Sequence, residues 1–163
     1  MALPEATDTV RAVVEELERR NLSLACAESL TGGALMATFV AVPGVSAVLR
    51  GGVTTYATDT KASVLGVSTS RLEETGPVDR EVALQMARGA CRLLTADVAL
   101  ATTGVAGPGP AEGHEAGTVW VACVGGLGEE AELLHVLGAR AEVRQAAIDA
   151  AVRILARRLT LGA

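Results

Sequence analysis

The strongest constraint on the fold is a short apolar run that passes directly into a glycine turn, at residues 22–33. The run reads Leu-Ser-Leu-Ala-Cys-Ala and is followed by Glu-Ser-Leu-Thr-Gly-Gly. From residue 34 onward the apolar side chains recur at helical spacing. This order predicts a strand, a tight turn and a helix, with Glu28, Ser29 and Thr31 at the carboxyl end of the strand. Open α/β sheets bind their ligands at this place.

The turn itself offers a ligand site. Gly32 and Gly33 let the backbone approach a ligand closely because neither residue carries a Cβ atom, and the free N–H groups of the following helix favour an anion. Ser29 is a candidate nucleophile here. The alternative is structural, since Ser29 or Thr31 can cap the helix and the glycines can close the turn. The segment is neither Gly-x-Ser-x-Gly nor a P-loop, so neither of those sites accounts for it.

Strand-like and helix-like patterns alternate along the whole chain. Helices are expected over residues 4–20, 33–42, 58–65, 68–75, 79–94 and 141–159. Strands are expected over residues 22–27, 46–56, 97–103, 118–124 and 131–137, the last two forming a hairpin. The alternation predicts an α/β fold, a three-layer α/β/α sandwich with a mixed, mainly parallel sheet of about five strands.

Three local signals refine this outline. The pair Gly51-Gly52 lies inside the second expected strand and predicts a bulge or a close backbone approach. Thr58 and Asp59 are expected to cap the short helix that follows, and Asp79 is expected to cap the helix over 79–94.

Composition narrows the classes of function. The 163 residues fit one domain over 1–163, and the high apolar content permits a homo-oligomer. The net charge is −5, and Phe, Tyr and Trp occur once each. Direct nucleic-acid binding is therefore not expected, because it needs clustered cations or stacked aromatic rings. Apolar runs stay below ~18 residues and no signal pattern opens the chain, so we expect a cytoplasmic protein without a membrane span.

The cysteines and histidines do not suggest a metal site. Cys26, Cys91 and Cys123 are scattered and none forms Cys-x-x-Cys. Neither His114 nor His135 has a close His or Cys neighbour in the sequence. These spacings indicate buried, reduced thiols rather than metal ligands, and they leave both histidines without a partner to orient a general base.

Three loops should meet at one edge of a mainly parallel sheet, over residues 28–33, 56–61 and 102–107. The second loop contributes Tyr56 and Lys61. A lysine near a helix start faces the positive end of the helix dipole, which favours the neutral amine, whereas Asp59 would favour the cation. A neutral lysine can take a proton from a serine hydroxyl. Taken alone, however, a lysine is normally solvated.

The remaining candidates come from the third loop and the last helix. Residues 104–110 are rich in glycine and proline and do not form a dinucleotide fingerprint. They can either cradle a phosphate or ribose with backbone groups or act as a rigid connection. Arg140 and Arg144 open the last helix, where one of them could reach a phosphate.

Three motifs in this order resemble one known family. Residues 27–33, Ala-Glu-Ser-Leu-Thr-Gly-Gly, are similar to the Ala-Glu-Ser-Cys-Thr-Gly-Gly signature of the CinA C-terminal domain family. Residues 52–56, Gly-Val-Thr-Thr-Tyr, with Lys61 resemble its Gly-x-Val-x-Tyr segment and lysine, and residues 103–108 with 117–119 resemble its Ser/Thr-Gly-Ile-Ala-Gly-Pro and Val-Gly-Thr-Val pair. The chain resembles a stand-alone form, without the molybdopterin-binding-like domain that often precedes this one.

The resemblance implies an enzyme, a nicotinamide-nucleotide amidase. It would hydrolyse the carboxamide of nicotinamide mononucleotide to nicotinate mononucleotide and ammonia, with no metal or organic cofactor. Ser29 would be the nucleophile, Lys61 the base and Tyr56 an assisting group. Glu28 could complement the pyridinium charge, backbone N–H groups near Gly32 and Gly33 or in residues 104–107 could stabilise an oxyanion, and Arg140 could hold the phosphate. The expected substrate contacts are Glu28, Thr31, Gly32, Gly33, Thr103, Gly104, Gly107 and Arg140.

The sequence departs from the family pattern at four places. Leu30 replaces the usual Cys, and Asp79-Arg80 stands where Ser-Glu is frequent. Glu115-Ala116 replaces a Lys-Pro pair, and Ala139 replaces an acidic residue before the last helix. The last two changes fall near the expected substrate loops. They keep two alternatives open: a catalytically silent nucleotide-binding or adaptor module associated with competence and DNA damage, and a hydrolase of a related amide or nucleotide.

Overall fold

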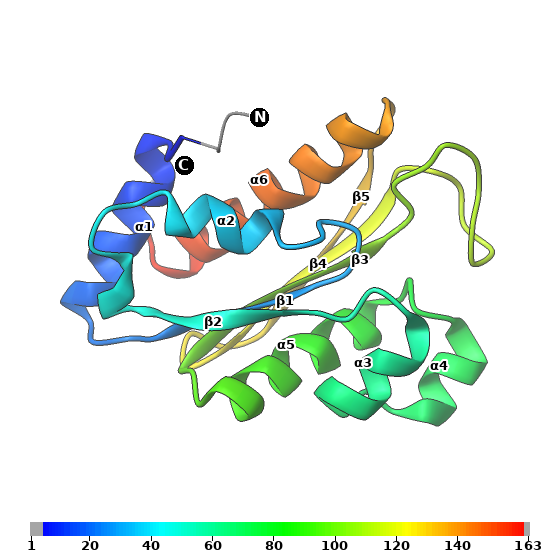
Figure 1. Cartoon of the computed structure of the whole chain (residues 1–163), viewed down its shortest axis with the longest axis horizontal. Helices are drawn as coiled ribbons and strands as arrows, with labels where there is room; N and C mark the ends of the chain where they lie inside the picture. Colours follow the sequence, from blue (N-terminus) through cyan, green and yellow to red (C-terminus); the bar gives the residue numbers. More distant parts are fainter. Residues whose placement is uncertain (1–4, 162–163) are drawn as a thin grey trace.

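A computed structural model describes residues 5–161 (Figure 1). The strands are β1 (Leu24–Glu28), β2 (Leu49–Thr54), β3 (Val98–Gly104), β4 (Thr118–Gly125) and β5 (Glu130–His135). The helices are α1 (Asp8–Arg19), α2 (Ala34–Val40), the 3₁₀ helix η1 (Val45–Ala47), α3 (Thr58–Leu65), α4 (Thr69–Thr75), α5 (Arg80–Leu94) and α6 (Arg140–Arg158).

The strands form one mixed sheet in the order β2-β1-β3-β4-β5. Strand β1 pairs in parallel with both β2 and β3, and β4 and β5 follow as an antiparallel hairpin. Helices α1, α2 and α6 cover one face of the sheet, and α3, α4 and α5 cover the other (Figure 1). The expected three-layer fold with a mixed sheet is therefore confirmed, with two of its four strand pairings parallel and two antiparallel. It brings the carboxyl ends of β1, β2 and β3 to one edge of the sheet.

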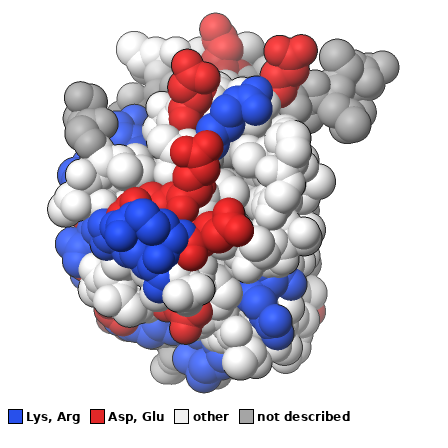
Figure 2. All heavy atoms as spheres, turned by 90° about the vertical axis from the view of Figure 1, so that its left-hand side faces the viewer, with Lys and Arg blue, Asp and Glu red and all other residues white. Residues whose placement is uncertain are grey.

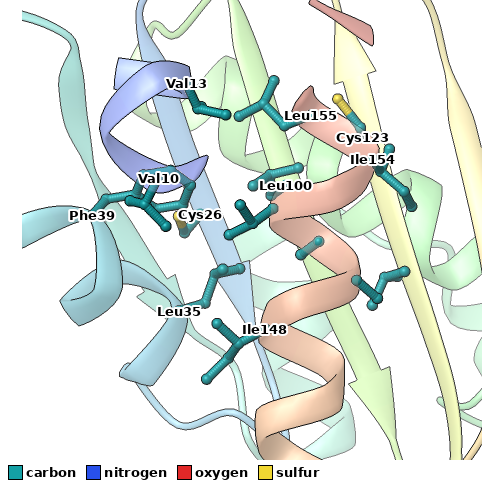
Figure 3. Close-up of a cluster of buried hydrophobic side chains, with 14 of the residues drawn as sticks. Val10, Val13, Cys26, Leu35, Phe39, Leu100, Cys123, Ile148, Ile154 and Leu155 are labelled. Atoms are coloured by element: carbon teal, nitrogen blue, oxygen red, sulfur yellow. The ribbon is translucent and has the colours of Figure 1, made fainter. Parts of the chain in front are cut away.

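The core on the α6 side is built from branched side chains that interlock across the layers. Figure 3 shows Val10 and Val13 of α1 and Phe39 of α2 around the sheet residues Cys26 and Leu100, with Ile148, Ile154 and Leu155 of α6 closing the cluster. Phe39 is completely buried. Truncation of such a side chain to alanine typically costs about 3–5 kcal/mol, so this layer anchors the sheet whose edge carries the site.

The opposite core is made of smaller residues and brings helices close to one another. Alanines of β1 and β3 face Ala83, Met86 and Ala87 of α5. A Cβ atom at Gly89 would lie 2.1 Å from the carbonyl oxygen of Leu65, the last residue of α3. Only glycine allows α5 to pack against the end of α3 at this distance, and α3 is the helix that carries Lys61.

Most expected elements are confirmed, with shifts at their ends that have identifiable causes. Helix α1 starts at Asp8 because the Thr7 hydroxyl accepts the Val10 N–H; Pro4, the expected start, lies outside the described residues. The strand expected from residue 46 begins only at Leu49, because Gly44 adopts a left-handed φ of 85° and one 3₁₀ turn follows.

The local signals in the next segment had mixed outcomes. The pairing of β1 with β2 skips one residue of β2 between Leu49 and Gly51, which confirms the expected bulge. The backbone also approaches α2 closely, since a Cβ atom at Gly52 would lie 2.7 Å from the Met36 sulfur. Asp79 caps α5 as expected, accepting the N–H groups of Glu81 and Val82. The expected capping of α3 by Thr58 and Asp59 is wrong, because its N-cap is Ala57, which has no side-chain hydrogen bond.

The distribution of surface charge and the apolar character of the helices relate to two expectations from the sequence, that the protein does not bind nucleic acid directly and does not span a membrane. On the face shown in Figure 2, acidic and basic side chains lie next to one another instead of in separate patches. On α1, for example, Arg19 and Arg20 both donate to the Glu16 carboxylate. Within residues 5–161, no helix combines the length and the apolar character that crossing a membrane requires.

Candidate active site

Ser29 is the first residue after β1 and lies in a tight double turn. The Ser29 carbonyl accepts the Gly32 N–H and the Thr31 carbonyl accepts the Ala34 N–H, each at 3.1 Å. Gly32 and Gly33 have φ values of 59° and 95°, a left-handed region that favours glycine. The turn leaves Ser29 nearly buried, with 8% of its surface exposed, at the sheet edge where the sequence predicted it.

Glu28 is occupied by the helix that follows this turn. Its carboxylate accepts the backbone N–H groups of Gly33, Leu35 and Met36 at 2.9–3.0 Å, and only 1% of the residue is exposed. The N-cap residue of α2, Gly33, supplies no side-chain bond of its own. Glu28 therefore caps α2 from the end of β1, where its charge also meets the positive end of the helix dipole, and neither Ser29 nor Thr31 is the cap.

Lys61 is buried beside Ser29. It lies in the first turn of α3, is 1% exposed, and its Nζ donates to Ser29 Oγ at 3.1 Å and to the Thr55 carbonyl oxygen at 2.7 Å. The expectation for a lysine taken alone, a solvated side chain, is wrong here. Burial lowers the pKa of Lys61 to about 8, and the opposing charge is the Glu112 carboxylate rather than the expected Asp59. At pH 7 roughly one tenth of the amine is then neutral.

These groups open into a cavity of about 210 Å³. Of the predicted site residues, it is lined by Ser29, Tyr56, Lys61, Thr103, Gly104, Gly107 and Arg140. The cavity lining does not include Glu28, Thr31, Gly32 or Gly33. The three expected loops do meet, because β1, β2 and β3 run parallel to one another. The turn residues Gly32 and Gly33, however, do not form a wall of the cavity.

Arg140 joins two of the loops at the mouth of the cavity. Its Nη2 donates to the Tyr56 hydroxyl at 2.9 Å and its Nη1 donates to the Gly107 carbonyl oxygen at 2.7 Å. Tyr56 is 61% exposed, so both side chains lie at the rim. Ala139, the N-cap residue of α6, donates its backbone N–H to the Glu142 carboxylate.

Two hydrogen bonds of buried threonines connect the segments that surround the cavity. The Thr31 and Thr102 hydroxyl oxygens lie 2.8 Å apart and tie the turn after β1 to β3. Thr103 Oγ1 donates to the Pro77 carbonyl oxygen at 2.7 Å. Pro77 and Val78, which precede α5, form a wall of the cavity that the sequence did not predict.

Arg144 was predicted only as one of two possible phosphate ligands, and its contacts indicate a different role. Its Nε and Nη2 donate to the carbonyl oxygens of Leu30 and Thr31, each at 2.9 Å. One turn of α6 separates Arg144 from Arg140, which places both on the same side of the helix. Arg144 therefore fixes the two peptide groups between Leu30 and Gly32, in the turn after Ser29.

The backbone hydrogen bonds around the cavity determine which N–H groups remain available to bind an oxyanion. The Gly32 N–H donates to Ser29 and the Gly33 N–H donates to Glu28, so the glycines expected to form an oxyanion site are already paired. Among the hydrogen bonds between residues 5–161, none uses the N–H of Leu30, Ala106 or Gly107, and all three residues line the cavity.

In the part of the chain that the structure describes, no three His, Cys, Asp or Glu side chains gather in a way that could hold an ion.

Solved structures share this fold over nearly their whole length. A CinA superfamily protein from Klebsiella pneumoniae superposes with a TM-score of 0.89 at 32% identity, covering 94% of this chain and 96% of that one. The competence/damage inducible protein CihA from Agrobacterium tumefaciens gives a TM-score of 0.85 at 32% identity, covering 97% of this chain and 99% of that one.

Curated relatives are closer in sequence but longer. A CinA-like protein of Frankia casuarinae is 41% identical over 155 residues, 94% of this chain and 36% of the relative. A protein of Pediococcus pentosaceus, whose name describes it as competence-damage inducible, is 48% identical over 109 residues, 67% of this chain and 26% of the relative. The chain thus spans about a quarter to a third of these two relatives. The sequence pattern of the CinA C-terminal domain matches residues 6–159, and the chain belongs to this family.

Proposed function

We propose that this protein is an amidase that hydrolyses the carboxamide of nicotinamide mononucleotide to nicotinate mononucleotide and ammonia. The observation that carries the proposal is the buried Lys61 amine, 3.1 Å from the Ser29 hydroxyl and with a pKa of about 8. A serine–lysine hydrolase needs a lysine with a lowered pKa beside its serine, so that part of the amine is neutral and can accept the hydroxyl proton.

The first half of the reaction forms an acyl-enzyme. Ser29 Oγ attacks the carboxamide carbon while its proton passes to the neutral Lys61 amine. The tetrahedral oxyanion is met by backbone N–H groups, for which Leu30, Ala106 and Gly107 are the candidates; removal of one such donor typically costs roughly 100- to 1,000-fold in rate. The C–N bond then breaks, Lys61 returns its proton to the leaving nitrogen, and ammonia departs.

The second half restores the enzyme. Lys61 takes a proton from a water molecule that attacks the Ser29 ester, the Ser29–acyl bond breaks, and the serine oxygen recovers a proton as nicotinate mononucleotide leaves. The Thr55 carbonyl supports both halves because its 2.7 Å contact holds Nζ beside Ser29. The buried base thus serves as acceptor and donor without leaving its position.

The cavity suits the two ends of the substrate differently. Its volume of about 210 Å³ fits a pyridine carboxamide, whereas the ribose phosphate would extend to the rim. At the rim, the Arg140 guanidinium can exchange its contacts with Tyr56 and Gly107 for a phosphate, a partner that arginine binds more strongly.

Ammonia release from nicotinamide mononucleotide tests the proposal. Ser29→Ala and Lys61→Ala should each reduce the rate by at least about 1,000-fold. Ser63→Ala, a matched serine on the same helix as Lys61 but away from the cavity lining, should leave the rate unchanged. If the wild-type protein releases no ammonia, or if both site variants keep the full rate, the proposal is wrong.

A further inference from the structure

The cavity has an asymmetric set of charges. Of the described residues that line it, Lys61 and Arg140 are basic and Glu112 is the one acidic residue. Glu28, the acid next to Ser29 in the sequence, lies outside the lining, is buried and is bonded to three N–H groups of the turn and of α2. Any positive charge on a ligand in this cavity would therefore find one carboxylate, that of Glu112.

Glu112 lies in a turn that two backbone hydrogen bonds close. Ala111 and His114 exchange two backbone hydrogen bonds of 3.0 and 2.9 Å, which closes a four-residue hairpin turn. Between them Glu112 has a φ of 54° and Gly113 a φ of 77°. Turns with two positive φ values favour Asn, Asp or Gly at the first position, and a non-glycine residue there costs about 1 kcal/mol or more. A glutamate kept at a strained position on a cavity wall points to a use for its side chain.

The negative charge of Glu112 acts on Lys61 in the cavity. It is the carboxylate that raises the pKa of Lys61 against the effect of burial. Its influence therefore reaches the group that would act on the carboxamide. A cationic ring seated between the turn and Ser29 would lie in the same field.

We propose that Glu112 is a specificity-determining residue that selects substrates whose ring carries a fixed positive charge, with the carboxylate placed opposite that charge. This inference rests on the proposed amidase function and names its substrate class: N-ribosylpyridinium carboxamides, in preference to neutral amides of the same shape. Arg140 at the rim and Glu112 on the wall then match a ligand that carries a phosphate at one end and a cationic ring at the other.

Binding measurements can distinguish an effect of the ring's charge on affinity from an effect of the ring's shape. The probes are nicotinamide mononucleotide and its reduced form, which has the same ribose phosphate but a neutral dihydropyridine ring. Calorimetry is carried out in a Ser29→Ala background, so that no turnover occurs. Glu112→Gln should weaken binding of the cationic form by about threefold to tenfold and of the reduced form by less than twofold. Glu112→Lys should weaken the cationic form further.

The matched control is Glu115→Gln, which removes the same charge from the same loop at a residue outside the cavity lining. It should change neither affinity. Equal losses for the two probes in Glu112→Gln, no loss for either, or no binding of either probe would overturn the proposal. Thermal melts confirm that the variants fold.

The two proposals can fail separately. Charge-selective binding without ammonia release in the wild type would leave the role of Glu112 standing and refute the amidase. If the wild type releases ammonia but Glu112→Gln weakens binding of both probes equally or of neither, the role of Glu112 is refuted and the amidase stands.

Discussion

Two charged side chains are buried to the same extent at this edge of the sheet, and they are treated in opposite ways. Glu28, at the end of β1, is 1% exposed and receives three backbone N–H groups of the turn and of α2. Lys61, in the first turn of α3, is also 1% exposed but contacts only one carbonyl oxygen and the Ser29 hydroxyl. The carboxylate is fully compensated, whereas the amine is pushed toward its neutral form.

The difference separates a structural charge from a reactive one. Burial of a charge is tolerated when hydrogen bonds replace its hydration, as at Glu28. Where they replace it only in part, the group changes its pKa and the fold loses stability, which is the usual situation of a catalytic group. The comparison thus predicts that the two residues respond to neutral substitutions in opposite directions.

Lys61→Met should give the largest effect. Ammonia release should fall by about 1,000-fold or more because no base remains beside Ser29. The same variant should be more stable than the wild type by about 1–3 kcal/mol at pH 7, because the cost of burying the amine disappears. Denaturant unfolding measures the gain.

The stability gain of Lys61→Met should depend on pH. The pKa of Lys61 is about 8 in the folded protein against 10.5 for an ordinary lysine. Below pH 8 both states are protonated and the gain is complete; between pH 8 and 10.5 only the unfolded wild type binds the proton, so the gain shrinks as the pH rises. A gain that grows over this range would contradict the assignment.

Glu28→Gln should act in the other direction. The amide can accept fewer of the three N–H groups and presents an NH₂ group to them, so we expect a loss of about 2–3 kcal/mol in the free energy of unfolding. Activity should decline with the fraction of folded protein, without a change in the pH dependence. Glu73→Gln, on the exposed surface of α4, is the matched control and should stay within about 0.5 kcal/mol of the wild type. Unchanged stability in Glu28→Gln would remove the contrast with Lys61.

Arg144→Gln tests how the turn after Ser29 is held. Loss of the contacts to the Leu30 and Thr31 carbonyls should let the Leu30 N–H drift from the oxyanion position, so kcat should fall by about 10- to 100-fold while KM changes little. Arg153→Gln, an exposed arginine of the same helix that pairs with Glu132, should affect neither constant. A change confined to KM would instead make Arg144 a phosphate ligand.

The smallest expected change is a shift in the pH dependence of turnover when Glu112 is replaced by Gln. The base must be neutral, so kcat/KM should rise about tenfold per pH unit below pH 8 and level off above it. Glu112→Gln removes the charge that raises the pKa of Lys61, so the bend should move to lower pH. Steady-state ammonia assays between pH 5.5 and 9.5 would check both, and a bend near 10 would mean that Lys61 is solvated.

The sequence could predict Ser29, Tyr56 and Lys61 as neighbours because parallel strands bring their carboxyl ends together whatever the details of packing. It could not predict the direction of Glu28. The strand ends one residue later than expected, and neighbouring residues on a strand point to opposite faces. Whether a residue at that point faces a cavity or a helix is therefore decided by register.

The roles of Arg144 and Glu112 depend on contacts that no local pattern contains. Arg144 bonds residues more than 110 positions away, across the layer that α6 forms. Glu112 gains its place from a turn with two positive φ values, which its sequence, Ala-Glu-Gly-His, does not specify. The burial of Lys61 likewise follows from tertiary packing, in which Gly89 admits α3 against α5.

The pKa of Lys61 tests the account most directly, and the chain is suited to the measurement because Lys61 is its only lysine. Protein labelled with ¹³C in lysine gives a single side-chain Cε signal, which can be followed by NMR from pH 6 to 11. The account predicts a midpoint near 8 that moves when Ser29 is replaced by alanine. A midpoint near 10.5, unchanged in Ser29→Ala, would show a solvated lysine and contradict the paired base on which the mechanism depends.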